Sequence, residues 1–423
     1  MLNTLADWLS YLESLHPKTI ALGLERVAQV KQRLNLNPDF PIITVGGTNG
    51  KGSVCAMLES ILHAAGYRVG CYTSPHLLHY NERVRIAKQT ASDAELCASF
   101  EKIEQVRGDT QLTYFEFGTL AAMQCFIEHK VDVAILEVGL GGRLDAVNVF
   151  DSDCAVIASV DIDHTDYLGG TREQIGFEKA GIFRKGRVAI CADEDMPQAV
   201  ANHAGKIGAE LWCIGKEFGF TPQQGQWDFH SKVNKRYALP YPALRGAYQI
   251  NNASAALAAL DALKDKLPVS MDAVRRGLGE VQLAGRFQFV PGKPTLILDV
   301  AHNPHAAHSM ARNLSGLPPC PHSYAVFAML ADKDIAGVAS ALDPHIDIWL
   351  VAGLDTPRSA TSEKLAQVLE QCRVRGEIKI CKNIPDALRY ACNAAGENDR
   401  IIAFGSFYTV AEVMSSTGLS ISR

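Results

Sequence analysis

Lys51 stands in a glycine-rich segment whose residue types suit phosphate chemistry. The run PIITVGGTNGKGS over 41–53 begins as an apolar strand pattern, breaks into four glycines and leads into the helical pattern VCAMLESILHAAG. Glycines let the backbone turn its N–H groups toward oxyanions, the start of the helix adds partial positive charge, and the lysine adds a mobile ammonium group. The segment therefore predicts a loop that binds a nucleoside triphosphate.

This loop is a variant of the common phosphate-binding pattern. That pattern, G-x-x-x-x-G-K-[ST], requires glycine where Val45 stands and a hydroxyl residue where Gly52 stands. The hydroxyl beside the lysine normally reaches Mg²⁺, and here Ser53 is displaced by one position, so it is a candidate for either phosphate or metal contact. A plain glycine turn between strand and helix is the alternative, and it leaves Lys51 unexplained.

Two acidic residues follow a second apolar run, VDVAILEVGLGGRLDAVN. The strand pattern delivers Glu137 to a strand end before a glycine-rich turn, the layout by which nucleotide-binding sheets place a carboxylate near the metal on the γ-phosphate. A surface glutamate before a loop is the other interpretation. Asp145, just after the turn, is equally consistent with a ligand contact and with a helix cap.

The segment SVDIDHTDYLG over 159–169 gathers four polar side chains at a strand end. These are Asp161, Asp163, His164 and Asp166. Mg²⁺ prefers oxygen, so His164 is either a metal ligand or a hydrogen-bonded structural histidine. Lys179 follows in REQIGFEKAGIFRKG, a helical and partly apolar setting. Spacing alone favours a surface lysine whose stem lies on apolar groups.

Polar residues also close other strand patterns. Ser74 and His76 follow the second strand, Asp299, His302 and Asn303 follow a strand in ILDVAHNPHA, and Ser406 follows the last strand in GSFYTV. Ligands of α/β sheets bind at the carboxyl ends of the strands. Two α/β regions with such residues suggest an active site between two domains, while helix caps would explain either segment alone.

The elements that must position these residues begin with an alternating α/β series. Strands are expected at 42–47, 68–74, 131–139, 154–160, 187–192 and 210–215, with helical patterns between them. This alternation predicts a mainly parallel sheet covered on both faces. Residues 216–247 are rich in Gly, Pro, Gln and aromatics and predict a hairpin or small sheet on the edge of the domain.

A second series begins after PGKP (291–294). Its strands are expected at 295–300, 323–330, 347–354, 377–382 and 400–407. No G-x-G-x-x-G follows its first strand, so a dinucleotide fingerprint is missing. The predicted fold class is α/β: a P-loop-type, mainly parallel sheet domain with a small β appendage over 1–290, and a second, Rossmann-like α/β domain over 291–423.

Composition excludes several classes of protein. At 423 residues and 47% hydrophobic content, two or three soluble domains are expected. A net charge of -5, with no basic stretch interleaved with aromatics, argues against nucleic acid as a partner. Acidic residues near the start, and the lack of any run of about 18 apolar residues, argue against a signal peptide or membrane span and for a cytoplasmic protein.

The 11 cysteines are scattered and form no C-x-x-C pair. Most lie within apolar runs, as do Cys55, Cys125, Cys154 and Cys191. They are expected to be small buried hydrophobes rather than bridges or zinc ligands.

Nine motifs, in order over nearly the whole chain, resemble one family. They are GTNGKGS, TSPHL, TYFEFGTLAA, LEVGLGGRLDA, DHTDYLG, EKAGIF, AGRF, DVAHNPHA and GSFYTV, and the early segment LHPKTIALGLERV fits too. The sequence resembles the bifunctional folylpolyglutamate synthase/dihydrofolate synthase family of Mur-ligase-like, ATP-dependent amide ligases. Gly46, Ser53 and Ala284 depart from the family's usual residues without removing a functional group.

The resemblance implies a reaction in which ATP phosphorylates a carboxylate, either that of dihydropteroate or the terminal one of a reduced folate. The α-amino group of L-glutamate then attacks the acyl phosphate and gives an amide, ADP and phosphate. Phosphate supplies the leaving group that a carboxylate lacks, while Mg²⁺ and Lys51 stabilise the phosphoryl charge. ATP, Mg²⁺ and these small molecules are the implied cofactors and partners, and a monomer is expected.

The resemblance also implies roles for individual residues. The phosphates would be held by Thr48, Asn49, Gly50, Lys51, Gly52 and Ser53, with further ATP contacts from Asn252, Arg286 and Asp299. The Mg²⁺ ligands would be Ser74, Glu137, His164 and Lys179, the last corresponding to a carbamylated lysine of the family. The pterin-bearing substrate would lie along Ile20, Ala21, Leu22, Gly23, Thr113, Tyr114, Phe115, Glu116, Leu144, Asp145 and Ala146. His302 and Ser406 resemble positions near the glutamate site, and the catalytic residues would be Lys51, Lys179 and His302.

Two other functions stay open at this point. One is a Mur-type ligase that acts on a nucleotide-linked peptidoglycan precursor, which the folate-type motifs disfavour. The other is an ATP-dependent switch, against which Glu137, Lys179 and the second polar cluster weigh, since a switch needs no second polar site. Whether both ligase activities are retained rests on the single motif TYFEFGTLAA.

Overall fold

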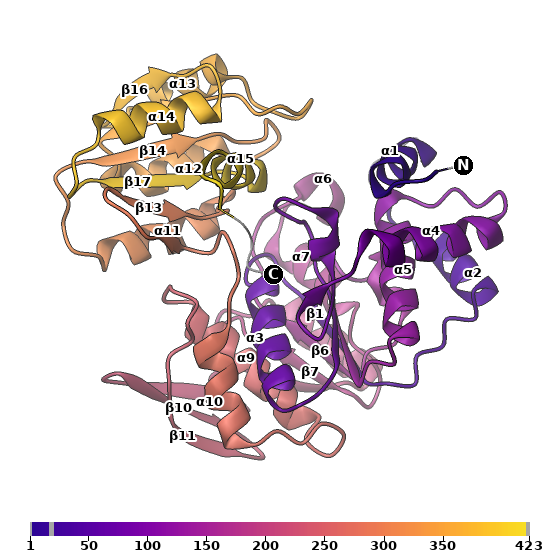
Figure 1. Cartoon of the computed structure of the whole chain (residues 1–423). Helices are drawn as coiled ribbons and strands as arrows, with labels where there is room; N and C mark the ends of the chain where they lie inside the picture. The colour runs from indigo at the N-terminus through magenta and orange to yellow at the C-terminus, as the bar shows by residue number, and fades with distance from the viewer. Residues whose placement is uncertain (1, 17–20, 420–423) are drawn as a thin grey trace. The chain divides into compact units, whose positions relative to one another are not determined.

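Two compact units make up the chain (Figure 1). The computed structural model describes residues 2–16 and 21–419. The first unit comprises Met1–Ala243 and Ile250–Val281, and the second comprises Leu244–Gln249 and Gln282–Arg423. Each unit has its own sheet and its own core, so each is described by itself.

An eight-stranded sheet forms the centre of the first unit, in the order β4-β3-β2-β5-β1-β6-β7-β8. Its strands are β1 (Ile42–Gly46), β2 (Val69–Tyr72), β3 (Val84–Ile86), β4 (Gln89–Thr90), β5 (Val133–Glu137), β6 (Cys154–Ile157), β7 (Val188–Cys191) and β8 (Glu210–Cys213). Every residue of β1 and β5 is buried, as expected when helices cover both faces of a parallel sheet. The predicted mainly parallel sheet is confirmed, with β3 and β4 as an antiparallel edge that the sequence did not indicate.

Helices surround this sheet. They are α1 (Leu5–Leu15), α2 (Glu25–Arg33), α3 (Lys51–Ala64), η1 (Tyr80–Arg83), α4 (Asp93–Arg107), α5 (Tyr114–Glu128), η2 (Ala146–Val149), α6 (Thr165–Leu168), α7 (Arg172–Ala180), α8 (Gln198–Ile207), α9 (Gln249–Ala262) and α10 (Met271–Glu280). A glycine lets two of them approach closely: a Cβ at Gly277 of α10 would lie 2.5 Å from Cα of Ile61 on α3. This packing fixes the helix that begins at Lys51.

A three-stranded antiparallel sheet extends the first unit. It consists of β9 (Phe218–Gln223), β10 (Gln226–Ser231) and β11 (Lys235–Leu239) in the order β11-β10-β9. Trp227 and Phe229 bury their rings beneath it, and Arg236 forms a buried ion pair of 2.6 Å with Asp261 on α9. The hairpin or small sheet predicted for 216–247 is confirmed.

A six-stranded sheet forms the centre of the second unit, in the order β12-β13-β17-β14-β15-β16. Its strands are β12 (Gln288–Val290), β13 (Thr295–Leu298), β14 (Ser323–Phe327), β15 (Ile348–Val351), β16 (Glu377–Ile380) and β17 (Arg400–Phe404). The helices are α11 (Pro304–Ser315), α12 (Ile335–Leu342), η3 (Asp343–His345), α13 (Ser362–Gln371), α14 (Ile384–Ala394) and α15 (Phe407–Thr417). All strands after β12 run parallel, as predicted for this α/β series.

The division between the units falls at residue 281, not at the expected 290. The reason is β12, which pairs antiparallel with β13 and so belongs to the second sheet. The sequence PGKP, which marked the expected boundary, is instead the turn between these two strands.

One short segment, Leu244–Gln249, also belongs to the second unit although α9 follows it directly in the first. The guanidinium of Arg245 lies 4.3 Å from the ring centre of Phe289, and that of Arg312 lies 4.6 Å from the ring centre of Tyr248. The backbone N–H of Ala247 donates to Oδ1 of Asn313 at 3.0 Å. Cation–π stacking and a hydrogen bond therefore hold this segment, termed the 244–249 segment below.

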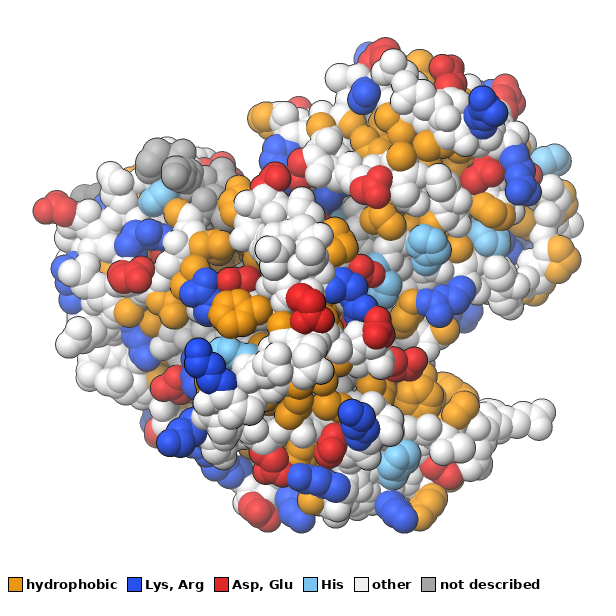
Figure 2. Space-filling model, turned by 180° about the vertical axis from the view of Figure 1, so that it is seen from behind, with side chains coloured by type: hydrophobic (Ala, Val, Ile, Leu, Met, Phe, Trp, Pro, Cys, Tyr) orange, Lys and Arg blue, Asp and Glu red, His pale blue; other side chains and the backbone are white. Residues whose placement is uncertain are grey.

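On the face in Figure 2, Lys and Arg side chains are interspersed with Asp and Glu. Within the described ranges, no helix is long and apolar enough to cross a membrane. The cysteines are free, and Cys55, Cys125, Cys154 and Cys191 are buried, which confirms their prediction as small core residues.

Candidate active site

The segment between β1 and α3 is a tight loop that ends in a left-handed glycine. Gly50 has a φ of 83° and caps α3, and a Cβ there would lie 2.6 Å from Oδ1 of Asn252 on α9. An L side chain would be both strained and blocked, so only glycine fits. Lys51 folds back over the loop, with Nζ donating to the carbonyl oxygens of Gly47 at 3.0 Å and Thr48 at 3.2 Å. The ammonium group of Lys51 is therefore held against the backbone of this loop.

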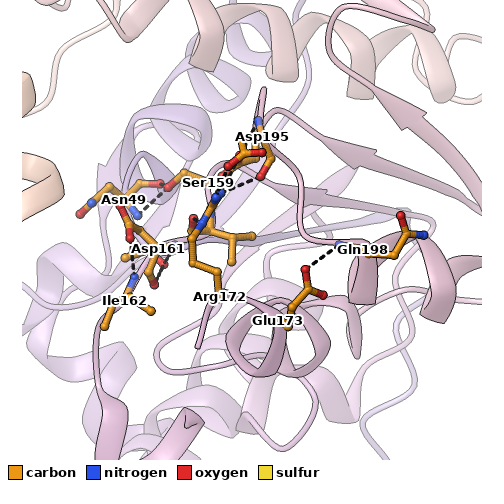
Figure 3. A network of polar contacts seen from close by, with 11 residues as sticks. Asn49, Ser159, Asp161, Ile162, Arg172, Glu173, Asp195 and Gln198 are labelled. Carbon is orange, nitrogen blue, oxygen red and sulfur yellow. Dashed lines mark hydrogen bonds and ion pairs between the residues drawn. The ribbon is translucent and has the colours of Figure 1, made fainter. Parts of the chain in front are cut away.

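This loop is docked on the segment that follows β6, residues 159–161 (Figure 3). The backbone N–H of Thr48 donates to the carbonyl oxygen of Ser159 at 2.8 Å, and that of Asn49 donates to Oγ of Ser159 at 3.0 Å. Oγ1 of Thr48 accepts from the N–H of Asp161 at 2.9 Å and donates to its carbonyl oxygen at 3.0 Å. The 159–161 segment thus sets the path of the loop at two successive residues.

Glu137 and Ser74 lie together at the ends of neighbouring strands. Glu137 is the last residue of β5 and is 4% exposed, which excludes the surface interpretation. Its Oε2 accepts the backbone N–H of Ser74 at 3.1 Å. Strand β5 pairs with both β1 and β2, so this pair lies beside the phosphate loop at the carboxyl edge of the sheet.

Asp145 is a buried cap. It caps η2, and its two carboxylate oxygens accept backbone N–H groups from Gly139 at 3.1 Å, Leu140 at 2.9 Å and Val147 at 3.1 Å. Burial raises its pKa to about 7, against the lowering effect of these bonds and of the Lys51 charge. Of the two interpretations left open by the sequence, the structure shows the cap, and it places this cap within the electrostatic reach of Lys51.

Lys179 is buried, and the prediction of a surface lysine is wrong. Lys179 is 3% exposed. Burial lowers its pKa to about 7, and the nearby positive charge of Lys51 is the second cause of this lowering. The last turn of α7 is covered by the glycine-rich turn after β5: a Cβ at Gly142 would lie 2.8 Å from the carbonyl oxygen of Glu178, which accepts the N–H of Arg143 at 2.8 Å. Local spacing could not reveal a cover supplied by a segment 35 residues earlier.

His164 is the N-cap residue of α6 and adopts the left-handed conformation, with a φ of 52°. Its backbone N–H donates to Oδ1 of Asp163 at 2.8 Å, and its side chain is about one-third exposed. No group of three or more His, Cys, Asp or Glu side chains that could hold a metal is found within 2–16 and 21–419. The expected set contains only two such residues, Glu137 and His164, and its carboxylate and hydroxyl oxygens are donors that suit a hard divalent cation.

The three segments expected to line the pterin-bearing substrate lie together. The N–H of Gly23 donates to the carbonyl oxygen of Leu144 at 3.3 Å. Arg26 joins the other two, because its guanidinium donates to the carbonyl oxygen of Ala21 at 2.6 Å and pairs with Glu116 at 3.0 Å. Ile20 lies outside the described residues, and the other expected positions in these segments are Leu22, Tyr114 and Ala146.

The start of α5 uses two of the expected substrate residues as a cap. Thr113 and Glu116 form a reciprocal capping box, in which the N–H of Thr113 donates to Oε2 of Glu116 at 2.7 Å. Phe115 lies against the turn after β5, since a Cβ at Gly139 would lie 2.7 Å from its ring. The polar groups of Thr113 and Glu116 therefore stabilise the start of α5.

A second cluster lies at the strand ends of the second unit. Asp299, just after β13, is half-buried and accepts N–H groups from Phe287 and Ala301, each at 2.8 Å. Burial raises its pKa, and the charge of Arg286 opposes that effect. Arg286 lies 5.1 Å from the ring centre of Phe407, and the ring centre of His302 lies 6.1 Å from the same ring. AGRF, DVAHNPHA and GSFYTV thus meet at one edge of this sheet.

The helix caps expected as the plain alternative are present in this cluster. Asn303 caps α11 and accepts the N–H of Ala306 at 2.9 Å, and Ser406 caps α15 and accepts the N–H of Tyr408 at 3.1 Å. Both residues are buried. The first unit brings together Lys51, Ser74, Glu137, Asp145 and Lys179, whereas Arg286, Asp299, His302 and Ser406 belong to the second unit.

Three residues with a clear place at the site were missed in the sequence. Arg26 lies in the segment LHPKTIALGLERV, Ser159 begins SVDIDHTDYLG, and Arg172 begins the helix that carries Lys179. All three act through backbone groups of other segments. Such contacts leave no spacing signal, because the partner atoms are carried by every residue type.

Fold and site together define a class of enzyme. The Mur ligase middle domain matches residues 45–260, and the glutamate ligase domain of Mur ligases matches residues 285–407. Each match coincides with one of the two α/β sheets and with its strand-end residues. The chain is an ATP-dependent ligase of the Mur type.

Individual relatives narrow the class. Dihydrofolate synthase/folylpolyglutamate synthase of Escherichia coli is 47% identical over 411 residues, which cover 97% of this chain and 94% of that protein. The structure of E. coli FolC in complex with DHPP and ADP matches with a TM-score of 0.94, at 46% identity over 98% of both chains. A bifunctional folylpolyglutamate synthase/dihydrofolate synthase with Mn, AMPPNP and L-glutamate bound matches with a TM-score of 0.91, at 48% identity over 99% of this chain and 98% of that one. The chain belongs to the dihydrofolate synthase/folylpolyglutamate synthase family, as the motifs predicted.

Proposed function

We propose that the chain joins L-glutamate to the carboxylate of dihydropteroate and to that of reduced folates, at the cost of one ATP. The observation that carries the proposal is the buried Lys179, held within the electrostatic reach of Lys51 and Asp145 in the unit that contains the phosphate loop. A nucleotide switch has no use for a second buried amine at this place. Membership of the family supports the same reaction.

The chemistry follows from the groups at the strand ends. A carboxylate is a poor acyl donor, and transfer of the γ-phosphoryl group to its oxygen supplies a leaving group. The ammonium of Lys51 and the N–H groups of the loop stabilise the charge on the phosphate that moves. The α-amino group of glutamate then displaces phosphate and forms the amide. The backbone N–H groups of Thr48 and Asn49 donate to Ser159, and these bonds fix the loop before the nucleotide binds.

A divalent cation belongs to this proposal. Ser74, Glu137 and His164 are the residues proposed to hold it, and the cation supplies charge neutralisation at the phosphates. Lys179 is proposed to be a carbamate: its neutral amine adds to CO₂, forms an N–C bond and loses a proton. A buried amine whose pKa is about 7 is largely neutral at slightly alkaline pH, which is the form that reacts.

The other assignments are proposed on the same basis. Asn252 is proposed to contact ATP because it stands against Gly50 of the loop. Arg286 and Asp299 are proposed as further ATP contacts, and His302 and Ser406 as residues of the glutamate site. The segments around Ala21, Phe115 and Ala146 are proposed to bind the pterin-bearing substrate. We further propose that the protein is cytoplasmic and monomeric, and sedimentation of the purified protein tests the second of these.

The decisive experiment measures ADP formation by the purified chain. Turnover is expected only when ATP, Mg²⁺, L-glutamate and dihydropteroate or tetrahydrofolate are all present, with an amide product of the matching mass. Equal turnover without a pterin would overturn the proposal. UDP-linked muramyl substrates in place of dihydropteroate test the peptidoglycan alternative, and comparison of dihydropteroate with tetrahydrofolate shows whether both activities are present.

A further inference from the structure

Arg172, the first residue of α7, makes a set of contacts that none of these roles uses (Figure 3). Its Nε donates to the carbonyl oxygen of Val160 at 3.0 Å. Its Nη2 donates to the carbonyl oxygen of Asp195 at 2.7 Å and to Oδ1 of Asp193 at 3.2 Å, while Nη1 pairs with the carboxylate of Asp195. One guanidinium thus joins the segment after β6 to the loop after β7.

Val160, the middle residue of the 159–161 segment, is held from this side at both of its backbone groups. Arg172 binds its carbonyl oxygen, and Oδ2 of Asp193 accepts its N–H at 2.6 Å. The ion pair between Arg172 and Asp193 closes this arrangement at 3.2 Å. Bonds to charged groups are the strong ones, so the peptide groups on either side of Val160 have little freedom to rotate.

The opposite side of the same segment carries the phosphate loop. Ser159 and Asp161, the two neighbours of Val160, form hydrogen bonds with Thr48 and Asn49. The 159–161 segment therefore contacts the phosphate loop through Ser159 and Asp161, and it contacts Arg172 and Asp193 through Val160. A rotation of the Val160 peptide groups would displace the groups that hold the loop.

The residue after Arg172 anchors the same helix, α7, which carries Lys179. This residue, Glu173, accepts the N–H groups of Gln198 at 3.0 Å and Ala199 at 2.7 Å, and so caps α8. The first turn of α7 is thereby anchored to both neighbouring segments. Its last turn carries Lys179.

We propose that Arg172 and Asp193 are positioning residues for the nucleotide. They touch neither ATP nor the reacting carboxylate. They hold the 159–161 segment in the conformation on which the phosphate loop is docked. Because Arg172 is the first residue of α7, the same contacts join α7 to this segment. The inference rests on the proposed phosphate-binding role of the loop, and it adds two residues that lie far from that loop in the sequence.

The test is direct binding of ADP to the full-length chain by isothermal titration calorimetry. Arg172→Met removes all four donated bonds and is expected to weaken ADP binding by about tenfold. The matched control is Arg187→Met, because Arg187 and Asp153 form a similar ion pair of 3.5 Å at the opposite ends of β6 and β7. The control is expected to bind ADP as the wild type does.

Two further measurements separate positioning from general loss of stability. In steady state, Arg172→Met is expected to raise KM for ATP while KM for dihydropteroate stays within about twofold. Asp193→Asn keeps an oxygen for the N–H of Val160 but loses the charge, so its loss of ADP affinity is expected to be smaller than that of Arg172→Met. It also serves as the second variant should the first one fold poorly.

Unchanged ADP affinity in folded Arg172→Met and Asp193→Asn would overturn the inference, as would equal losses in Arg187→Met. Failure of the proposed ligase reaction would leave this experiment valid, because ADP binding is measured without a folate or glutamate. Wild-type protein that binds ADP yet forms no amide would therefore refute the proposed function alone.

Discussion

The backbone N–H of Ser74 donates to Oε2 of Glu137 at 3.1 Å, across the ends of strands β2 and β5. The carboxylate is buried, and its orientation is set by a peptide group of the neighbouring strand rather than by a mobile side chain. A carboxylate oriented in this way can meet a cation without first losing rotamer freedom. The pair therefore links the sheet register to the chemistry of the site.

Glu137→Gln tests that carboxylate. Glutamine keeps the size of the side chain and an oxygen for the N–H of Ser74, but it removes the charge. We expect kcat for ligation to fall by about 100-fold or more, since a carboxylate on the phosphate-bound cation contributes several kcal/mol to charge stabilisation. The temperature of thermal unfolding should not fall. Burial of a charged carboxylate costs free energy, and the neutral amide of glutamine avoids that cost.

Glu397→Gln is the control for this variant, because Glu397 is an exposed carboxylate paired with Lys293. It should leave ligation unchanged. Steady-state rates at saturating Mg²⁺ and ATP give the comparison. A Glu137→Gln enzyme with wild-type kcat would rule out a role of this carboxylate at the metal.

Lys179→Met tests the buried amine through stability. The folded-state pKa of Lys179 is about 7 and lies below the ordinary lysine value of 10.5, so between these pH values the folded chain binds fewer protons than the unfolded chain. The free energy of unfolding of the wild type therefore rises with pH across this window, and the variant lacks this contribution. In CO₂-free buffer, Lys179→Met should be the more stable protein at pH 7, with a smaller advantage at pH 9. Denaturant unfolding at the two pH values measures this, and a constant difference would contradict the lowered pKa.

The same variant tests the proposed carbamate through activity. Lys179→Met should fold and bind ADP but form no amide. Lys206→Met, which removes an exposed lysine from α8, should ligate normally. Full ligation by Lys179→Met would exclude the carbamate.

Gly50→Ala tests the nucleotide loop. The added Cβ would meet Oδ1 of Asn252 at 2.6 Å, and the residue would keep a positive φ. Gly66→Ala is the matched control at the other end of α3, because Gly66 has a φ of 93° and no atom within 4 Å of the added Cβ. Both variants should lose about 1 kcal/mol of stability from backbone strain. Only Gly50→Ala should lose ADP affinity in calorimetry; equal ADP affinity in the two variants would contradict the steric argument.

Arg26→Met tests the contact that joins the proposed pterin segments. Glu116 is 3% exposed, so removal of its partner leaves a buried charge and should cost about 3 kcal/mol in the free energy of unfolding. KM for dihydropteroate should rise because Ala21 loses its anchor. The double variant with Glu116→Gln should recover much of the stability without restoring KM. A single variant as stable as the wild type would show that the pair is not a structural link.

Periodicity and glycine placement were enough to predict the strands that carry the site. Every predicted strand is present, because apolar runs between helices in a parallel sheet are buried on both faces whatever their partners. The strands missed, β3, β4 and β12, are only two or three residues long. Such short strands contain too few residues for a period of two to be recognised in the sequence.

Lys179 shows where sequence reasoning about the site stops. Lys179 follows Glu178 in a short helical segment that is only partly apolar, so the local pattern places the amine in water. Its burial comes from the glycine-rich turn at 139–142, which is far away in sequence and makes contact through its backbone. Resemblance to a family, not spacing, pointed to this residue. Arg172 and Ser159 were missed for the same physical reason, since they bind main-chain atoms.

The 244–249 segment has a consequence for how such chains can recombine. Tyr248 and Arg245 stack on side chains of the second unit, yet they precede the whole of α9 and α10 in the sequence. A C-terminal domain exchanged between relatives at residue 282 would arrive without the six residues that pack with it. In such a hybrid, the 244–249 segment of one relative would pack against the second unit of another. Exchange of the second unit alone is therefore disfavoured, and the 244–249 segment and the rest of the second unit are expected to diverge together.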